Sequence, residues 1–437
     1  MRGVIQERYE ALRSGLSSSF QDLVVVGRHL SEASAILGKI CRKYDLLLIA
    51  YTACLAAIVL TNDRNAPRSI YFIAVLPVAI FVGLAFARRV ITTSIVFWAV
   101  AVYLLAMGLG SLTATDIPPN DLSRHFRLIP LVLSYLMVIG FFATDPKSLK
   151  RLLLVSGVLV AASALLNLVS YHAIWGCPPI VSPWRLCAVL GMPDYINSTN
   201  ISAPYALYAV GALAALVHSD LLRVERALFA ASAAILLVAL AFTEARSGLL
   251  AAMLGFAVSA ATGPRWCRLA LGALAAVIIV ALAASPFLQD ILFSRGLSYR
   301  PELWSLFLFM GLEQPFLGHG ILDNIDQRMR DGTLIDQPHN LVLSAFVRGG
   351  IVGAVAMATA IGGAVYWAAR YCFKTRNVIP LALIATMVGY GMVDYQLLVT
   401  YPTWPWITFW FPLGICVGVE TLMRSPEPHE AVPKLSA

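Results

Sequence analysis

Charged residues are scarce in this chain. Asp, Glu, Lys and Arg make up only 13% of its 437 residues, whereas hydrophobic residues make up 59%. This composition excludes an ordinary soluble domain, in which about a quarter of the residues are charged. The mean hydropathy of +0.77 indicates a membrane protein instead.

Cysteines and paired acidic motifs are also scarce. Of the seven cysteines, only Cys177 and Cys187 fall in loops that we assign below to the outer face. Their spacing does not resemble a zinc site. An oxidising compartment permits a disulfide between them, and two free thiols remain the alternative. The outer loops contain no Asp-x-Asp pair of the kind that holds Mg²⁺ on a diphosphate, so no metal site is predicted.

Long apolar runs dominate the rest of the chain. A helix needs about 20 apolar residues to cross the hydrocarbon core, and on this basis the sequence predicts about twelve spans. They are 45–61, 69–87, 92–110, 128–143, 152–172, 200–217, 227–242, 246–262, 268–285, 341–369, 378–398 and 404–423. Gly349, Gly350 and Gly353 near the start of 341–369 indicate a break there. We therefore predict one all-α polytopic membrane domain over 45–423.

The basic residues predict the orientation of this domain. Most of the 32 Lys and Arg residues lie in 1–44 and in alternate connections, at 88–89, 147–151, 223–226, 265–268 and 370–376. The positive-inside rule places these segments in the cytoplasm, together with both termini, 1–44 and 424–437. The first 44 residues are polar, so no signal peptide is expected. The net charge of +8 then indicates contact with anionic membrane lipids and not with nucleic acid.

The longest outer loop is predicted at 286–340. Loops of this length without function are uncommon. Within it, 301–312 has the pattern of a helix with Pro301 in the first turn. Its apolar character fits a helix that lies on or in the membrane interface.

Arginines are the chemically distinctive residues near the outer face. Arg246 opens one predicted span, Arg295 and Arg300 lie in the long loop, and Arg348 lies just inside another span. A guanidinium group binds phosphate bidentately and stays ionised when desolvated. Such a cluster would hold a lipid-linked diphosphate and stabilise it as a leaving group. For each arginine, a snorkelling anchor remains the alternative.

Two further residues suit chemistry at this face. His339 lies at the end of the long loop, and histidine is suited to act as a general base near neutral pH. Asp394 lies within the predicted span 378–398, where a carboxylate is costly. We expect Asp394 to pair with an arginine or to orient His339.

Three motifs in this order resemble a known superfamily. The sequence Pro338-His339-Asn340-Leu341-x-Leu343, followed by Gly350 and Gly353, resembles the H-N-x-x-L…G-x-x-G signature of the O-antigen ligases and polymerases. Arg246-Ser247-Gly248 is similar to the family element that opens a span. Arg300-x-x-x-Trp304, followed by Pro315-x-x-Gly318-x-Gly320, is similar to the family stretch before the histidine.

The resemblance implies a metal-independent membrane glycosyltransferase with a GT-C-like helical fold and no cofactor. A ligase of this kind moves a polysaccharide from undecaprenyl diphosphate to a lipid A–core sugar, on the periplasmic side of the bacterial inner membrane. By this resemblance His339 would activate the acceptor hydroxyl, and Arg246 and Arg300 would hold the diphosphate. The remaining substrate-binding candidates are Arg295, Arg348, Asn340, Trp304 and Asp394. Arg348 departs from the pattern, because many members have Glu at that position.

Other functions remain open from the sequence. An O-antigen polymerase would use the same donor with a second lipid-linked chain as acceptor, and a relative could glycosylate protein. The single large outer loop before the His-Asn motif favours the ligase, since polymerases often carry two. A transporter of lipid-linked sugars would be expected to show inverted repeats, which the sequence lacks.

Overall fold

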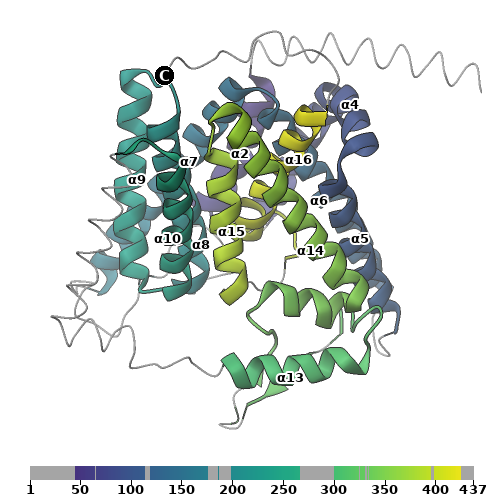
Figure 1. The fold of residues 1–437 in the computed structure, drawn as a ribbon. Coiled ribbons are helices and arrows are strands. Elements are labelled where there is room, and N and C mark those ends of the chain that lie inside the picture. The colour runs from purple at the N-terminus through teal and green to yellow at the C-terminus, as the bar shows by residue number, and fades with distance from the viewer. Residues whose placement is uncertain are drawn as a thin grey trace, which may run out of the picture.

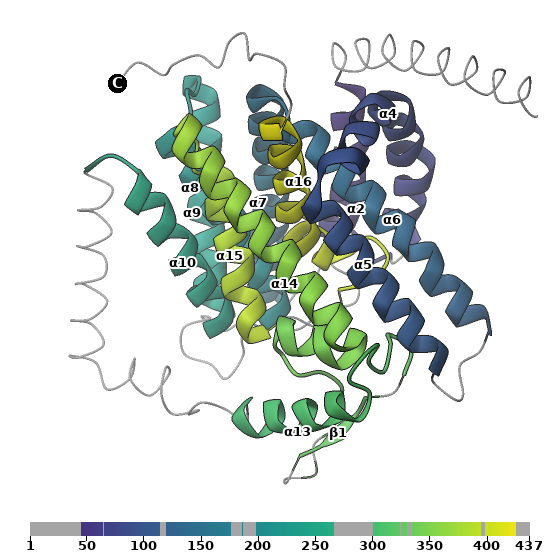
Figure 2. The same cartoon turned by 45° about the vertical axis from the view of Figure 1, so that its right-hand side comes forward.

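The computed structural model describes residues 45–63, 65–113, 119–175, 186, 198–265, 300–323, 325–329, 332, 334–394 and 398–424. Within these ranges the chain is a bundle of helices with one short antiparallel pairing, between β1 (Gln327–Arg328) and β2 (Leu334–Ile335). The long helices run side by side, and α13 (Arg300–Glu313) lies across one end of the bundle (Figures 1 and 2). The prediction of an all-α membrane protein is confirmed.

The other helices follow the apolar runs of the sequence. They are α2 (Leu46–Leu60), α3 (Asn65–Ile70), the π-helix η1 (Tyr71–Val75), α4 (Leu76–Thr93), α5 (Ile95–Gly110), the 3₁₀-helix η2 (Ser111–Thr113), α6 (Pro119–Ala143), α7 (Pro146–Trp175), α8 (Ser198–His218), α9 (Arg223–Thr243), α10 (Arg246–Thr262), α14 (Leu341–Thr375), α15 (Ile379–Asp394), the π-helix η3 (Trp406–Trp410) and α16 (Phe411–Arg424). Every predicted span except 268–285 coincides with a described helix. The segments 1–44, 268–285 and 425–437 lie outside the described residues.

Not every apolar helix is long enough to span a membrane by itself. Six of the described helices are long and apolar enough to cross a membrane. The bent run from α3 to α4 would be a seventh if it forms one span. The helices α2, α5, α10 and α15 are apolar but shorter. That the chain crosses the membrane twelve times therefore stays a prediction.

Helix α14 is broken at Gly350, as the glycines of the sequence predicted. Gly350 has φ +60° and ψ −161°, which lies outside the helical region. A Cβ atom at this position would collide with the backbone of Phe316 and Leu317. Only glycine satisfies both the left-handed backbone and the close approach of the loop.

The loop 315–320 packs into this break. The N–H of Ile351 donates to the carbonyl of Pro315 at 2.7 Å, and the N–H of His319 donates to the carbonyl of Val347 at 2.9 Å. A broken helix leaves backbone groups without partners, and inside a membrane each such group is costly. The loop supplies these partners, so the P-x-x-G-x-G motif and the glycines of α14 form one structural unit.

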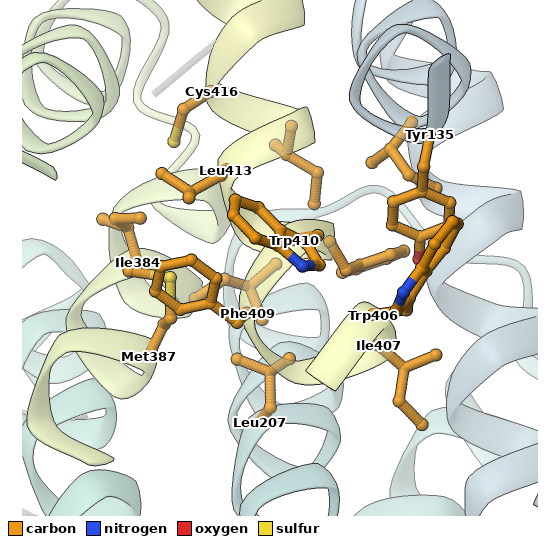
Figure 3. Close-up of a cluster of buried hydrophobic side chains, with 14 of the residues drawn as sticks. Tyr135, Leu207, Ile384, Met387, Trp406, Ile407, Phe409, Trp410, Leu413 and Cys416 are labelled. Atoms are coloured by element: carbon orange, nitrogen blue, oxygen red, sulfur yellow. The ribbon is translucent and has the colours of Figure 1, made fainter. Parts of the chain in front are cut away.

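Aromatic side chains fill the centre of the bundle. Trp406, Phe409 and Trp410 are buried and pack among residues of α6, α8 and α15 (Figure 3). Each indole has a partner for its N–H, because Trp406 donates to the carbonyl of Thr400 at 2.9 Å and Trp410 donates to that of Leu398 at 3.0 Å. These bonds satisfy polar groups that would otherwise be buried unpaired.

Candidate active site

Three helix ends meet at the end of the bundle near α13. His339 lies just before α14, Asp394 is the last residue of α15, and Ser247 lies in the first turn of α10. The Nδ1 atom of His339 lies 2.9 Å from Oδ1 of Asp394, and the hydroxyl of Ser247 donates to Oδ2 of Asp394 at 2.9 Å. The carboxylate thus joins segments that are far apart in the sequence.

The contact with Asp394 orients the imidazole of His339. The Asp394 side chain is only 6% exposed, whereas the His339 side chain is 28% exposed. An ionised carboxylate only accepts hydrogen bonds, so in the neutral imidazole this contact selects the tautomer that carries its proton on Nδ1 and a lone pair on Nε2. The histidine is therefore both oriented and accessible, which suits a group that takes a proton from a substrate.

Asn340 holds the two helices together at this point. Its Oδ1 atom accepts from the N–H of Leu343 at 3.0 Å and so caps the start of α14. Its Nδ2 atom donates to the carbonyl of Met392 near the end of α15 at 3.0 Å. The preceding His339 has a φ of +48°, a left-handed conformation that is uncommon for residues other than glycine. The contacts of Asn340 therefore give it a structural role, whereas the backbone conformation of His339 does not by itself favour a histidine.

The motif Arg246-Ser247-Gly248 is explained by the same packing. Arg246 is the half-buried first residue of α10, and Ser247 reaches Asp394. A Cβ atom at Gly248 would lie 2.5 Å from the hydroxyl oxygen of Ser202 on α8, so a side chain does not fit there. Just before the motif, Glu244 has a φ of +48°, and partial burial raises the pKa of its carboxyl group.

Trp304 connects helix α13 to the histidine segment. Its indole N–H donates to the carbonyl of Pro338, directly before His339, at 3.0 Å. Arg300 lies four residues earlier in α13, and residues at this spacing share one face of a helix. The R-x-x-x-W motif therefore places Arg300 one helical turn before Trp304, on the face of α13 that contacts Pro338. Leu303 and Phe307 anchor α13 by packing in a cluster that includes Val347 of α14.

Arg348 contacts the loop that packs into the break in α14. Its Nη1 atom lies 3.0–3.1 Å from the carbonyl oxygens of Gly320, Ile321 and Asp323. Arg348 was among the predicted substrate-binding candidates, and that role stays a prediction. In the structure its Nη1 atom binds the backbone of the loop at the break in α14. The loop places several backbone carbonyl groups close to α14, and the guanidinium group of Arg348 donates hydrogen bonds to three of them.

His319 also belongs to the loop. It is 5% exposed. Its Nδ1 atom lies 3.1 Å from Asp323 Oδ2, and its Nε2 atom lies 2.9 Å from the Met310 carbonyl oxygen.

Sequence reasoning missed Ser247 as a partner of Asp394, although its position beside Arg246 was a usable signal. Arg295, Cys177 and Cys187 lie outside the described residues.

Comparison with known proteins finds similarity over part of the chain. Residues 231–358 match a family model described as O-antigen ligase. These residues include Arg246, Arg300 and His339 but end before Asp394. The chain is also 28% identical over 151 residues to the O-antigen ligase of Pseudomonas aeruginosa strain PAO1. That match covers 33% of this chain and 36% of the relative, so the chain spans about a third of the length of the relative it matches.

Proposed function

We propose that this protein, whose residues 231–358 carry the O-antigen ligase domain, is an O-antigen ligase of the bacterial inner membrane. It transfers polysaccharide from undecaprenyl diphosphate to a sugar of lipid A–core, on the periplasmic side. The observation that carries the proposal is the His339–Asp394 pair at 2.9 Å. Its histidine belongs to the His-Asn motif, and the contact leaves Nε2 facing away from the carboxylate.

In the proposed reaction His339 is the general base. An acceptor hydroxyl gives its proton to Nε2 as its oxygen attacks the anomeric carbon of the donor sugar. The bond from that carbon to the diphosphate oxygen breaks, and its electron pair leaves with undecaprenyl diphosphate. Attack opposite the leaving group inverts the anomeric centre. Asp394 stabilises the imidazolium that forms, because its buried carboxylate accepts from Nδ1.

The departing diphosphate needs positive charge close to the histidine. Arg246 stands at the first position of α10, where the helix dipole also favours an anion. The contact between Ser247 and Asp394 brings this helix start next to His339. We assign Arg246 and Arg300 to the diphosphate and keep Arg295 as a further candidate. We propose Arg348 as a positioning residue for the loop.

The surface of α13 supports a site at headgroup depth. Its outward residues are strongly apolar, with Phe309 68% exposed and Leu312 55% exposed, and Phe316 just beyond the helix is 74% exposed. Exposed side chains of this kind insert into the membrane interface. A lipid-linked diphosphate lies at the same depth, so α13 would hold the catalytic histidine level with its substrate.

The opposite end of the bundle is basic. Arg223 begins α9, and Arg376 and Arg424 lie at the ends of α14 and α16. Helix α14 runs from His339 toward Arg376, so these arginines lie away from the catalytic end. The positive-inside rule then supports a cytoplasmic position for this end and a periplasmic position for His339.

A lipopolysaccharide gel tests the proposed function. A strain lacking the protein should produce bare lipid A–core while long polymer accumulates on undecaprenyl diphosphate. Complementation with the wild type should restore the ladder of O-chain lengths. A deletion strain whose core carries a single repeat unit would instead identify the protein as a polymerase, which joins one lipid-linked chain to another.

A further inference from the structure

A lateral groove lies on the surface of the bundle between α5 and α14. Its volume is about 730 Å³, which is within the range of about 300–1,000 Å³ typical of ligand pockets. The buried Ala99 and Ala356 form its floor, and Trp98, Val102, Ile351 and Val355 form its rims. The rim residues are 43–56% exposed. Small side chains between larger ones thus leave a channel that is open toward the surrounding membrane.

The groove begins close to the break in α14 and ends at a basic residue. Ile351 follows Gly350 directly, and Arg424, at the end of α16, lines the groove together with Ser94 before α5. At this end Gly363 of α14 lies beside Val96 of α5. Since α14 runs away from His339, the Arg424 end is the one remote from the proposed active site.

A buried carboxylate holds Arg424 in place. Glu420 is fully buried, and its oxygens accept from the hydroxyl of Ser94 at 2.7 Å and from the N–H groups of Ile95 and Val96 at 2.9 and 3.1 Å. Arg424 Nη2 lies 3.1 Å from Glu420 Oε1. The carboxylate is thus shared between the start of α5 and the arginine, which leaves Arg424 with donors for another anion.

Further positive charge surrounds this end of the groove. The guanidinium groups of Arg424 and Arg370 lie 4.8 and 5.3 Å from the ring centre of Trp367. Arg88 and Arg89 are exposed near the end of α4, one turn before Thr92 and Thr93, which line the groove. The hydroxyl groups of these threonines donate to their own helix. Recognition of an anion therefore falls to the arginines.

We propose that this groove binds one anionic phospholipid, with an acyl chain between α5 and α14 and its phosphate at Arg424. An open apolar channel in a membrane is filled by hydrocarbon, because an empty one forfeits packing contacts along its walls. Basic pockets between membrane helices bind anionic head groups. The proposal is independent of the transfer reaction, since no residue of the candidate active site takes part.

Lipid retention by the purified protein tests the proposal. Native mass spectrometry should detect one bound phosphatidylglycerol, retained about tenfold better than phosphatidylcholine with the same chains. Both lipids carry a phosphate, but the choline cation of the second is repelled by the arginines around this end of the groove. The double variant Arg424→Gln with Glu420→Gln should lose this preference without leaving a buried charge unpaired. Glu420→Gln alone retains Arg424 and should keep the preference. Arg226→Gln, at an exposed arginine of α9, should also keep it.

A second variant tests the channel itself. Ala356→Phe should fill the groove and reduce retention of both lipids, whereas Ala230→Phe on the exposed face of α9 should not. If Ala356→Phe does not fold, Val102→Trp fills the groove from its α5 rim instead. Equal retention of the two lipids by the wild type would overturn the proposal. So would unchanged retention in the filled variant, or displacement of phosphatidylglycerol by an equal amount of undecaprenyl phosphate.

Discussion

Nδ1 of His339 and Oδ1 of Asp394 lie 2.9 Å apart, although the two residues are separated by 55 positions in the chain. A carboxylate at the end of an apolar helix is costly unless it is paired. Here its two oxygens are engaged by the imidazole and by Ser247. The pair gives Asp394 a specific role in our account, which is to hold the histidine in one tautomer and one orientation.

Removing the charge of Asp394 should therefore impair transfer. We expect Asp394→Asn to lower the rate by about 100-fold, since general-base catalysis contributes about 10²–10⁴-fold and the amide can stabilise the wrong tautomer. Ser247→Ala removes one neutral donor and should cost less than about tenfold. The measurement is the initial rate of polysaccharide transfer by purified protein. A wild-type rate for Asp394→Asn would remove Asp394 from the mechanism.

The two diphosphate arginines should not tolerate lysine. Arg246→Lys and Arg300→Lys retain the charge but lose the planar fork that binds two phosphate oxygens. Transfer should fall by about tenfold or more in each variant, as the loss of one charged hydrogen bond implies. Arg226→Lys at the remote end is the matched control and should transfer normally. Full activity in either test variant would reduce that arginine to an interfacial anchor.

The break in α14 should be sensitive to a single methyl group. Gly350→Ala places a Cβ against the backbone of Phe316 in a left-handed conformation, so we expect a loss of more than about 2 kcal/mol in stability. Gly362→Ala lies in the same helix, and beyond the adjoining residues and backbone of that helix no atom lies within 4 Å of the added carbon. It should change stability by no more than about 1 kcal/mol, in the stabilising direction. Thermal unfolding of both variants measures the difference, and equal melting temperatures would contradict the role of the break.

Transfer should not require a divalent metal. The resemblance to the superfamily implies that arginines alone stabilise the leaving diphosphate. EDTA should therefore leave the rate of the purified protein unchanged. Activity that is lost with EDTA and restored with Mg²⁺ would show that the arginines are not sufficient.

Hydropathy predicted most of the fold because each span must satisfy its own backbone within the membrane. The runs at 227–242 and 341–369 correspond closely to α9 and to the greater part of α14. The break at Gly350 was also predictable, since clustered glycines at the start of a long span favour it. Hydropathy alone does not determine how helices are ordered around the bundle. The neighbours of α5, for example, depend on contacts between distant segments.

The candidate site was only partly predictable for the same reason. The His-Asn motif identified His339, and the cost of a carboxylate in a span drew attention to Asp394. The sequence predicted that Asp394 would either pair with an arginine or orient His339. The structure shows the contact with His339. The position of Arg348 was not predictable, because its carbonyl partners lie more than twenty residues earlier in a loop whose path the sequence does not specify.

The most direct test of the account is the transfer rate of His339 variants measured with purified donor and acceptor. His339→Ala and His339→Gln should both fold, elute as the wild type does, and lose about 10²–10⁴-fold in rate. Gln keeps an N–H donor but has no nitrogen that accepts a proton, so it separates a base from a mere hydrogen-bonding group. Transfer by His339→Gln at the wild-type rate would contradict the assignment of His339 as the catalytic base.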